Sequence, residues 1–243
     1  MKIFRHHPLT TAEIVKWVQD LRGHAYVPES NFDVTAILRT QIGGDATYYF
    51  GGVNVENVDH RKGTHGEEGA IAASVTALGK HAEIAEVWFM GAPLGMEPTS
   101  PSPLVDNLTA SCGKCRQQIV NLATGPDIPM HCVSLRGDIE TTTLRQLLPK
   151  NFSFRDIAPE LAHAHSTRQE GLSLPQTSII ERRLSRVGPL NKKEICAWLH
   201  ELQSIDFATQ IGHTVIIGLS NGHYVAGVKV EEAAYIDMAL LTK

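Results

Sequence analysis

A histidine and two cysteines are the first residues in this sequence whose types and spacing suggest chemistry. His65 is followed two residues later by Glu67, and Cys112 and Cys115 follow further along as a C-x-x-C pair. Two thiolates and one imidazole suit zinc, and three protein ligands leave a fourth position for water. Such a water ionises near neutral pH, and Glu67 could move its proton without binding the metal. The order of the two motifs therefore predicts a catalytic zinc site.

The same residues also allow plainer interpretations. The C-x-x-C pair could be a metal-free or thioredoxin-like dithiol, although no β-α-β unit opens the chain. Glu67 could be an ordinary first-turn helix acid favoured by the helix dipole, which is our interpretation of Glu68. The H-x-E motif upstream of the cysteines, with each motif opening a predicted helix, favours zinc.

Asn54 and Glu56 are candidates for binding a diol. They lie two residues apart at the end of a predicted strand, so their side chains point to one face. Together they offer donors and acceptors that suit a diol. Taken alone, they would more often be turn residues after a strand, and Phe32 alone would be a core residue.

Helices and strands alternate along the segment that must position these residues. Thr10 and Glu13 form a capping-box pattern ahead of an amphipathic helix. Ser111 is predicted to cap the helix that carries Cys115, with a stop at Gly125. Helices are predicted over residues 11–22, 67–78, 112–124 and 141–148, and strands over residues 32–38, 46–53, 84–90 and 130–135. This alternation predicts an α/β fold, a three-layer α/β/α domain with a mixed sheet.

The chain then begins a second copy of its own pattern. Leu9, Glu13, Ile14, Trp17 and Leu21 match Leu190, Glu194, Ile195, Trp198 and Leu202 at one constant offset, and residues 52–56 are echoed by residues 227–231. We predict a catalytic domain over residues 1–150, a connector over 151–188 that wraps it, and a partial repeat over 189–243. The repeat has no counterpart of His65 or of the cysteine helix and carries Lys229 in place of Asn54. It is therefore predicted to be non-catalytic and to pack on the first domain or on a partner subunit.

Composition argues against several classes of function. The formal net charge of −4 and the lack of a long Lys/Arg cluster leave no footprint for binding nucleic acid. The sequence contains no run of about eighteen apolar residues, so it predicts no membrane span. It also has no apolar N-terminal segment of the kind that indicates a secretory signal. We expect a cytoplasmic protein with a small neutral substrate.

The sequence resembles the cytidine deaminase family over nearly its whole length, particularly the large bacterial form in which a degenerate copy follows the catalytic domain. The segments that carry the resemblance are residues 30–34, 54–57, 65–67 with 70–71, 111–117, and 147–149 with Phe152. The resemblance implies that Asn54 and Glu56 bind the ribose hydroxyls and that Phe32 contacts the base. It also implies that the Gly66 amide orients the carbonyl at C2, that Glu67 protonates N3 and then the leaving ammonia, and that the protein is a homodimer.

The sequence departs from the family pattern near the site. Gly66 and Ser111 stand where the family usually has Ala and Pro. More residues separate His65 from Cys112 in the sequence than in the family, and the extra residues fall at 91–110. Because long loops beside sites often carry specificity, we expect this segment to influence the choice of substrate.

We expect hydrolytic deamination of cytidine and 2'-deoxycytidine by zinc-activated water. One alternative is a nucleoside-binding zinc protein without turnover, because the longer segment or the changes at Gly66 and Ser111 could obstruct the site. Another is the same chemistry on a different amino-pyrimidine or on a nucleic acid. The acidic charge balance argues against the nucleic acid.

Overall fold

The computed structural model describes residues 3–42, 46–79, 82–151, 175–205 and 213–230. These residues divide into two compact units. Unit 1 takes its described residues from Met1–Gln41, Thr47–Ile71 and Glu83–Ser153, and unit 2 from Ile42–Ala46, Ala72–Ala82 and Phe154–Lys243. In the described part of the chain, no helix is long and apolar enough to cross a membrane.

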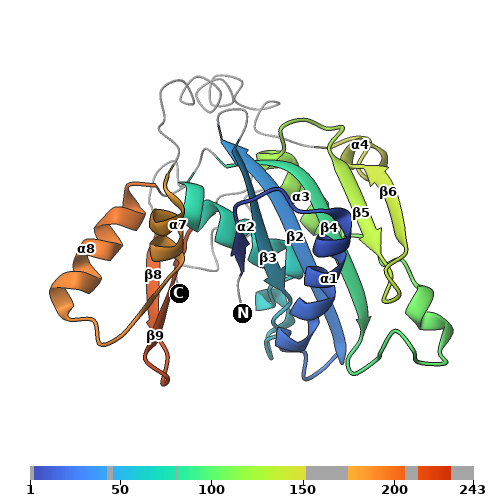
Figure 1. The fold of residues 1–243 in the computed structure, drawn as a ribbon, viewed down its shortest axis with the longest axis horizontal. Coiled ribbons are helices and arrows are strands. Elements are labelled where there is room, and N and C mark those ends of the chain that lie inside the picture. Colours follow the sequence, from blue (N-terminus) through green and yellow to red (C-terminus); the bar gives the residue numbers. More distant parts are fainter. Residues whose placement is uncertain (1–2, 43–45, 80–81, 152–174, 206–212, 231–243) are drawn as a thin grey trace. The chain divides into compact units, whose positions relative to one another are not determined.

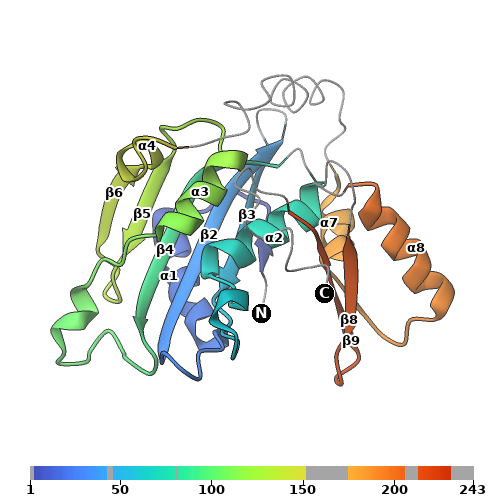
Figure 2. The same cartoon turned by 180° about the vertical axis from the view of Figure 1, so that it is seen from behind.

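Unit 1 is built on a six-stranded sheet with the order β1-β3-β2-β4-β5-β6 (Figure 1). The strands are β1 (Phe4–Arg5), β2 (Phe32–Ile42), β3 (Ala46–Val53), β4 (Glu83–Pro93), β5 (Pro129–Val133) and β6 (Ile139–Thr143). Strand β4 pairs with β5 in parallel and with β2 antiparallel, so the sheet is mixed. Helix α1 (Thr11–Leu21) lies on one face, and α3 (Gly113–Leu122) and the start of α2 (Gly66–Leu78) lie on the other (Figure 2). The predicted three-layer α/β/α fold is confirmed.

Local sequence explains α1. The Thr10 backbone N–H donates to Glu13 Oε2 at 2.8 Å, and the Glu13 N–H donates to Thr10 Oγ1 at 3.3 Å, which completes the predicted capping box. Its apolar stripe, spaced at helical intervals, is buried in the core between α1 and the sheet. The stripe comprises Ile14, Trp17, Val18 and Leu21.

The cap of α3 differs from the prediction. Cys112, not Ser111, is the N-cap residue, and its sulfur accepts a hydrogen bond from the Cys115 backbone N–H at 3.5 Å. The helix also ends at Leu122, before Gly125, because Ala123 leaves it to form a parallel bridge with Ile84. A thiolate can fill the role of a capping oxygen, because the helix N-terminus favours negative charge.

The predicted helix over residues 141–148 is wrong over its first part. Residues Ile139–Thr143 form β6, which pairs antiparallel with β5, and only Leu144–Leu147 are helical. The run of three threonines at 141–143 is β-branched and therefore suits a strand. Thr143 then caps the short helix α4 through Gln146.

Unit 2 contains α7 (Thr177–Leu184), β7 (Ser185–Val187), α8 (Lys192–Gln203), β8 (Thr214–Gly218) and β9 (His223–Val228). Residues 177–187 of the predicted connector thus form α7 and β7 within this unit, whereas residues 152–174 lie outside the described part. The helices and strands of unit 2 therefore begin before residue 189. The division into 1–150, 151–188 and 189–243, and the wrapping of the connector, stay predictions.

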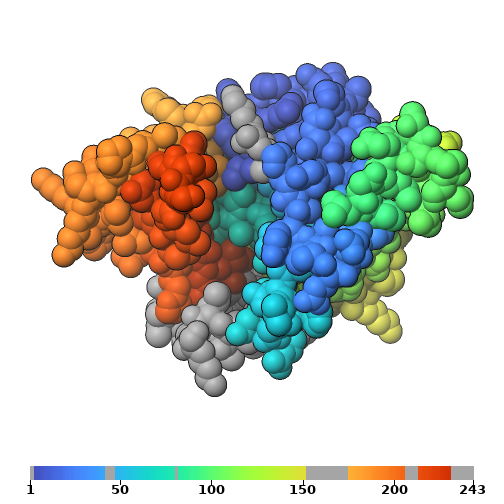
Figure 3. Space-filling view, turned by 90° about the horizontal axis from the view of Figure 1, so that it is seen from below, coloured from blue at the N-terminus to red at the C-terminus, as the bar shows by residue number. Residues whose placement is uncertain are grey.

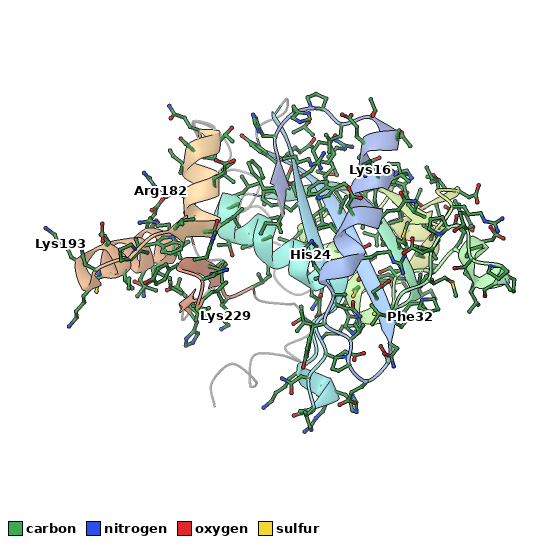
Figure 4. All side chains as sticks on the ribbon, turned by 60° about the horizontal axis from the view of Figure 1, so that its bottom comes forward. Lys16, His24, Phe32, Arg182, Lys193 and Lys229 are labelled. Atoms are coloured by element: carbon green, nitrogen blue, oxygen red, sulfur yellow. The ribbon has the colours of Figure 1, made fainter. Side chains whose placement is uncertain are left out.

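The first elements of unit 1 recur in unit 2. The strand order β7-β9-β8 matches β1-β3-β2, and the Asn191–Glu194 capping box of α8 matches that of α1. Arg186 stacks over Trp198 at 4.4 Å, as Arg5 stacks over Trp17 at 4.6 Å. Lys229, which stands where the first copy has Asn54, directly follows β9 (Figure 4) and is buried.

Gly52 on β3 sets how closely α2 approaches the sheet. A Cβ at this position would overlap the backbone nitrogen of Ala70 and the carbonyl oxygen of Gly66, both on α2. At Gly227, its counterpart in the repeat, the nearest described atom to such a Cβ is Val215 Cγ1 at 3.7 Å. Only a glycine at 52 therefore allows α2 to lie where it does.

Gly52→Ala is expected to lower the free energy of unfolding by about 1–3 kcal/mol, or about 2–10 °C in Tm, because two backbone segments must separate. Gly227→Ala, the matched control, is expected to change Tm by less than half as much. Thermal unfolding followed by circular dichroism measures both. Equal Tm values for the two variants would contradict the close packing of α2 on β3.

Candidate metal centre and substrate site

The three predicted metal ligands lie together in unit 1. His65 Nδ1 is 3.4 Å from Cys112 Sγ and 3.4 Å from Cys115 Sγ, and all three atoms lie within 4.8 Å of one another. With Zn–S bonds of about 2.3 Å and a Zn–N bond of about 2.0 Å, a tetrahedral zinc site separates nitrogen from sulfur by about 3.5 Å. The donor atoms are therefore positioned to hold a metal ion, and their types and spacing fit zinc.

Helix starts bring these ligands together. His65 directly precedes α2, Cys112 caps α3, and Cys115 lies in the first turn of α3. The Cys115 backbone N–H donates to Cys112 Sγ at 3.5 Å, so the partial positive charge of the α3 N-terminus is directed at that sulfur. His65 and Cys112 are exposed whereas Cys115 is buried, so the site is open on one side.

The two thiols share one proton unequally. Hydrogen bonds from Cys115 and His65 lower the pKa of Cys112 to about 3. The hydrogen bond with Cys112, burial, and the charge of Glu67 raise the pKa of Cys115. The hydrogen bond with Cys112 also raises the pKa of His65. Cys112 is thus the thiolate of the pair, and a divalent cation is needed to stabilise both sulfurs as thiolates.

Glu67 lies in the first turn of α2 and is buried, with 3% of its surface exposed. It follows His65 by two residues, and its negative charge contributes to raising the pKa of both Cys115 and His65. The adjacent Gly66 rests against β2, where a Cβ would lie only 2.9 Å from the Val34 carbonyl oxygen. The Gly at this position therefore allows the helix start to approach β2 closely.

Three of the predicted substrate residues meet at the start of β2. Asn54 Oδ1 accepts from the Val34 backbone N–H at 2.8 Å, and Asn54 Nδ2 donates to the Phe32 carbonyl at 3.0 Å. Gly66 packs on the same Val34. Phe32 is half-buried at the first position of β2 (Figure 4). The amide of Asn54 thus joins two segments of chain and keeps one N–H for another partner.

Glu56 holds a different loop. Its carboxylate accepts from the backbone N–H groups of Glu29 at 2.8 Å and Ser30 at 3.2 Å. Hydrogen bonds from Ser30 and Glu29 keep the pKa of Glu56 below its usual range, so the side chain is an anion at neutral pH. It is an acceptor for hydroxyl groups of the kind that a sugar offers.

The long segment at residues 91–110 is anchored to unit 1. The Arg22 guanidinium forms a two-fold ion pair with buried Asp33, with Nε–Oδ1 at 2.8 Å, and donates to the carbonyls of Pro93 and Met96. Val105 is completely buried. In the space-filling view the green atoms of this segment lie at the surface of the unit (Figure 3). The segment is thus held at its start by hydrogen bonds from Arg22 to its backbone carbonyls, and nearer its end by the buried Val105 side chain.

The end of this segment reaches the base-contact candidate. Thr109 Oγ1 donates to the Gly91 carbonyl at 3.1 Å. A Cβ at Gly91 would lie 2.8 Å from the Phe32 ring and 3.1 Å from the Thr109 methyl carbon. The segment therefore helps to position Phe32, which sequence reasoning did not predict.

Sequence reasoning also missed how the two ligand-bearing helices are joined. Glu68, interpreted as a simple first-turn acid, contacts the His65 backbone and residues of α3. Arg116 donates to the Leu147 carbonyl at 2.8 Å and so ties α3 to α4. The signal for the first contact is weak, because Glu68 lies three residues after His65 as in a capping box, but His65 is not the Ser or Thr of that pattern.

Comparison with known proteins identifies the family. No family model matches the chain. A cytidine deaminase of Sporosarcina psychrophila is 33% identical over 141 residues, which are 56% of this chain and 87% of that protein. Crystal structures of cytidine deaminases from Burkholderia pseudomallei (28% identity, TM-score 0.47, 59% of this chain and 100% of that one) and Mycobacterium leprae (23%, 0.42, 59% and 100%) are also similar. On the identity to the Sporosarcina protein and its coverage, the chain belongs to the cytidine deaminase family.

Proposed function

We propose that this protein catalyses the hydrolytic deamination of cytidine and 2'-deoxycytidine to uridine and 2'-deoxyuridine, with release of ammonia. The observation that carries the proposal is the cluster of His65, Cys112 and Cys115 with buried Glu67 beside it. A structural zinc site has no use for that carboxylate. Membership of the cytidine deaminase family supports the same reaction.

His65, Cys112 and Cys115 would hold the zinc ion. When bound, zinc acidifies a water molecule at its open position and supplies a nucleophile at neutral pH. Glu67 would take the proton released from that water, deliver it to N3 of the pyrimidine, and then pass a proton to the departing amino group. Its burial keeps bulk water from competing for that proton.

The other residues would orient the nucleoside. The Gly66 backbone N–H would donate to the carbonyl oxygen at C2, and Phe32 would contact the base. Asn54 and Glu56 would bind the ribose hydroxyls. The side chain of Asn54, a candidate for binding the sugar, forms hydrogen bonds with the backbone of Val34 and of Phe32, the candidate for contacting the base. These bonds hold the two candidates next to each other, which supports one binding site for the whole nucleoside.

The test is turnover of cytidine, 2'-deoxycytidine, cytosine and adenosine under identical conditions, followed by chromatography, with zinc measured by elemental analysis. We expect zinc-containing protein that converts only the two nucleosides of cytosine. Zinc-loaded protein that binds cytidine in calorimetry and forms no product would replace this proposal with that of a nucleoside-binding protein. Turnover of another amino-pyrimidine alone would correct the substrate.

The sugar contacts give a separate prediction. Glu56→Gln is expected to raise KM for cytidine about tenfold, because a charge-assisted hydrogen bond to a hydroxyl is weakened. With 2',3'-dideoxycytidine, which lacks both hydroxyls, the variant and the original protein should have the same kcat/KM. An equal loss of kcat/KM on both substrates would show that Glu56 acts only through the loop at Glu29 and Ser30.

We also propose that the protein is a cytoplasmic homodimer in which the second unit contributes to assembly. The similarity to the large bacterial form and the recurrence of the first elements of unit 1 in unit 2 support this proposal. Sedimentation equilibrium of the full chain should give twice the mass of 26.6 kDa. A monomer at micromolar concentration would contradict it.

A further inference from the structure

One carboxylate connects the two helices that carry the metal ligands. Glu68 Oε2 accepts a hydrogen bond from the His65 backbone N–H at 2.8 Å. Glu68 Oε1 accepts one from Gln118 Nε2 at 2.8 Å and lies 2.8 Å from Lys114 Nζ. Lys114 stands between the two cysteines in sequence, and Gln118 follows Cys115 by one helical turn. The Glu68 side chain of α2 is thus hydrogen-bonded both to the histidine ligand's backbone and to the helix that carries the two cysteine ligands.

Burial makes these contacts costly to lose. The Glu68 side chain is 13% exposed and that of Lys114 is 37% exposed, so the carboxylate is largely removed from water. A buried charge without partners is strongly unfavourable, whereas one with three hydrogen-bonding partners is stable. Loss of any one partner therefore affects the other two.

Charge balance explains the need for Lys114. Zinc requires both cysteines as thiolates, and Glu67 adds a third negative charge. Glu68 adds a fourth, which would oppose the thiolates without a compensating cation. The ammonium of Lys114, in contact with Glu68, neutralises that charge close to the sulfur atoms.

We propose that Glu68, held by Lys114 and Gln118, is a positioning residue that fixes His65 and the start of α2 relative to Cys112 and Cys115. The inference rests on the proposed zinc site and concerns retention and geometry of the metal rather than contact with substrate. Ligand distances in a well-formed metal site lie within about 0.2 Å of their standard values. A clamp on the His65 backbone therefore acts directly on zinc binding.

The experiment measures zinc retention instead of turnover. Zinc-loaded full-length protein is mixed with the chelating dye 4-(2-pyridylazo)resorcinol, and the rate of zinc release is recorded for Glu68→Ala, Glu68→Gln and Lys114→Ala. We expect release about 10–100-fold faster for Glu68→Ala, in the range typical for partners that orient metal ligands. Glu68→Gln retains an acceptor for the His65 N–H but loses the ion pair, so its release rate should be intermediate.

Coupling and a control make the result specific. Because Glu68 and Lys114 act as a pair, the double variant Glu68→Ala/Lys114→Ala should release zinc no faster than Glu68→Ala alone. Asp127→Ala, which breaks the exposed Asp127–Arg145 ion pair elsewhere in unit 1, should release zinc at the original rate. The visible absorption spectrum of cobalt-substituted Glu68→Ala should shift, because the ligand geometry around the metal changes.

If Glu68→Ala and Lys114→Ala release zinc at the same rate as the original protein and their cobalt spectra are unchanged, the clamp is overturned. The deaminase proposal is left intact by that result. Conversely, zinc-loaded protein without turnover would remove the deaminase proposal, while altered zinc release in these variants would still support the clamp. If Glu68→Ala fails to fold, Glu68→Gln and Lys114→Ala decide the result. An original protein that binds no zinc would refute both.

Discussion

Replacement of Glu67 by Gln is expected to lower kcat for cytidine by about 10²–10⁴-fold, the usual contribution of a positioned general acid–base group. Gln has the same shape but neither accepts nor releases a proton at neutral pH. Because Glu67 is 3% exposed, bulk water cannot easily replace it as a proton carrier. Zinc content should stay unchanged, since Glu67 is not among the ligand atoms.

The measurement is steady-state kinetics of uridine formation, with zinc determined on the same samples. Glu181→Gln, at an exposed position of α7, is the matched control and should retain the original kcat. A kcat for Glu67→Gln within a factor of ten of the original protein would refute the proton-transfer role. Loss of zinc together with activity would instead assign Glu67 to the support of the metal site.

The second large effect is expected for Cys115→Ala. Its sulfur is buried, lies 3.4 Å from His65 Nδ1 and is one of the three donor atoms of the site. Zinc should fall from about one ion per chain to a small fraction, because structural and catalytic zinc sites need their full ligand set. Turnover should be lost in proportion.

Cys132→Ala is the matched control for this variant. Cys132 is also a buried cysteine of unit 1, and burial raises its pKa to about 11, so it is a neutral thiol on β5. Its replacement creates a small cavity and is expected to leave zinc content unchanged. Elemental analysis of both variants decides the outcome. Full zinc in Cys115→Ala, or equal loss in both variants, would contradict the assignment of Cys115 as a ligand.

Local patterns predicted the elements that depend on neighbouring residues. The capping box of Thr10 and Glu13 and the apolar spacing of α1 act within a few turns, so they are visible in sequence. The end of α2 at Gly79, with φ of 74°, follows from the conformational freedom of glycine. The helix predicted over residues 141–148 was wrong at its start because pairing with β5 overrides a weak local preference.

The sequence by itself determined which chemistry is available: the residue types and order of His65, Glu67, Cys112 and Cys115 select zinc and a proton carrier. Only the tertiary structure decided how those groups meet. Helix α2 can approach β3 because Gly52 has no side chain. The clamp formed by Glu68 depends on Lys114 and Gln118, which lie on another helix, α3. Contacts between residues distant in sequence depend on the packing of whole elements, which no local spacing encodes.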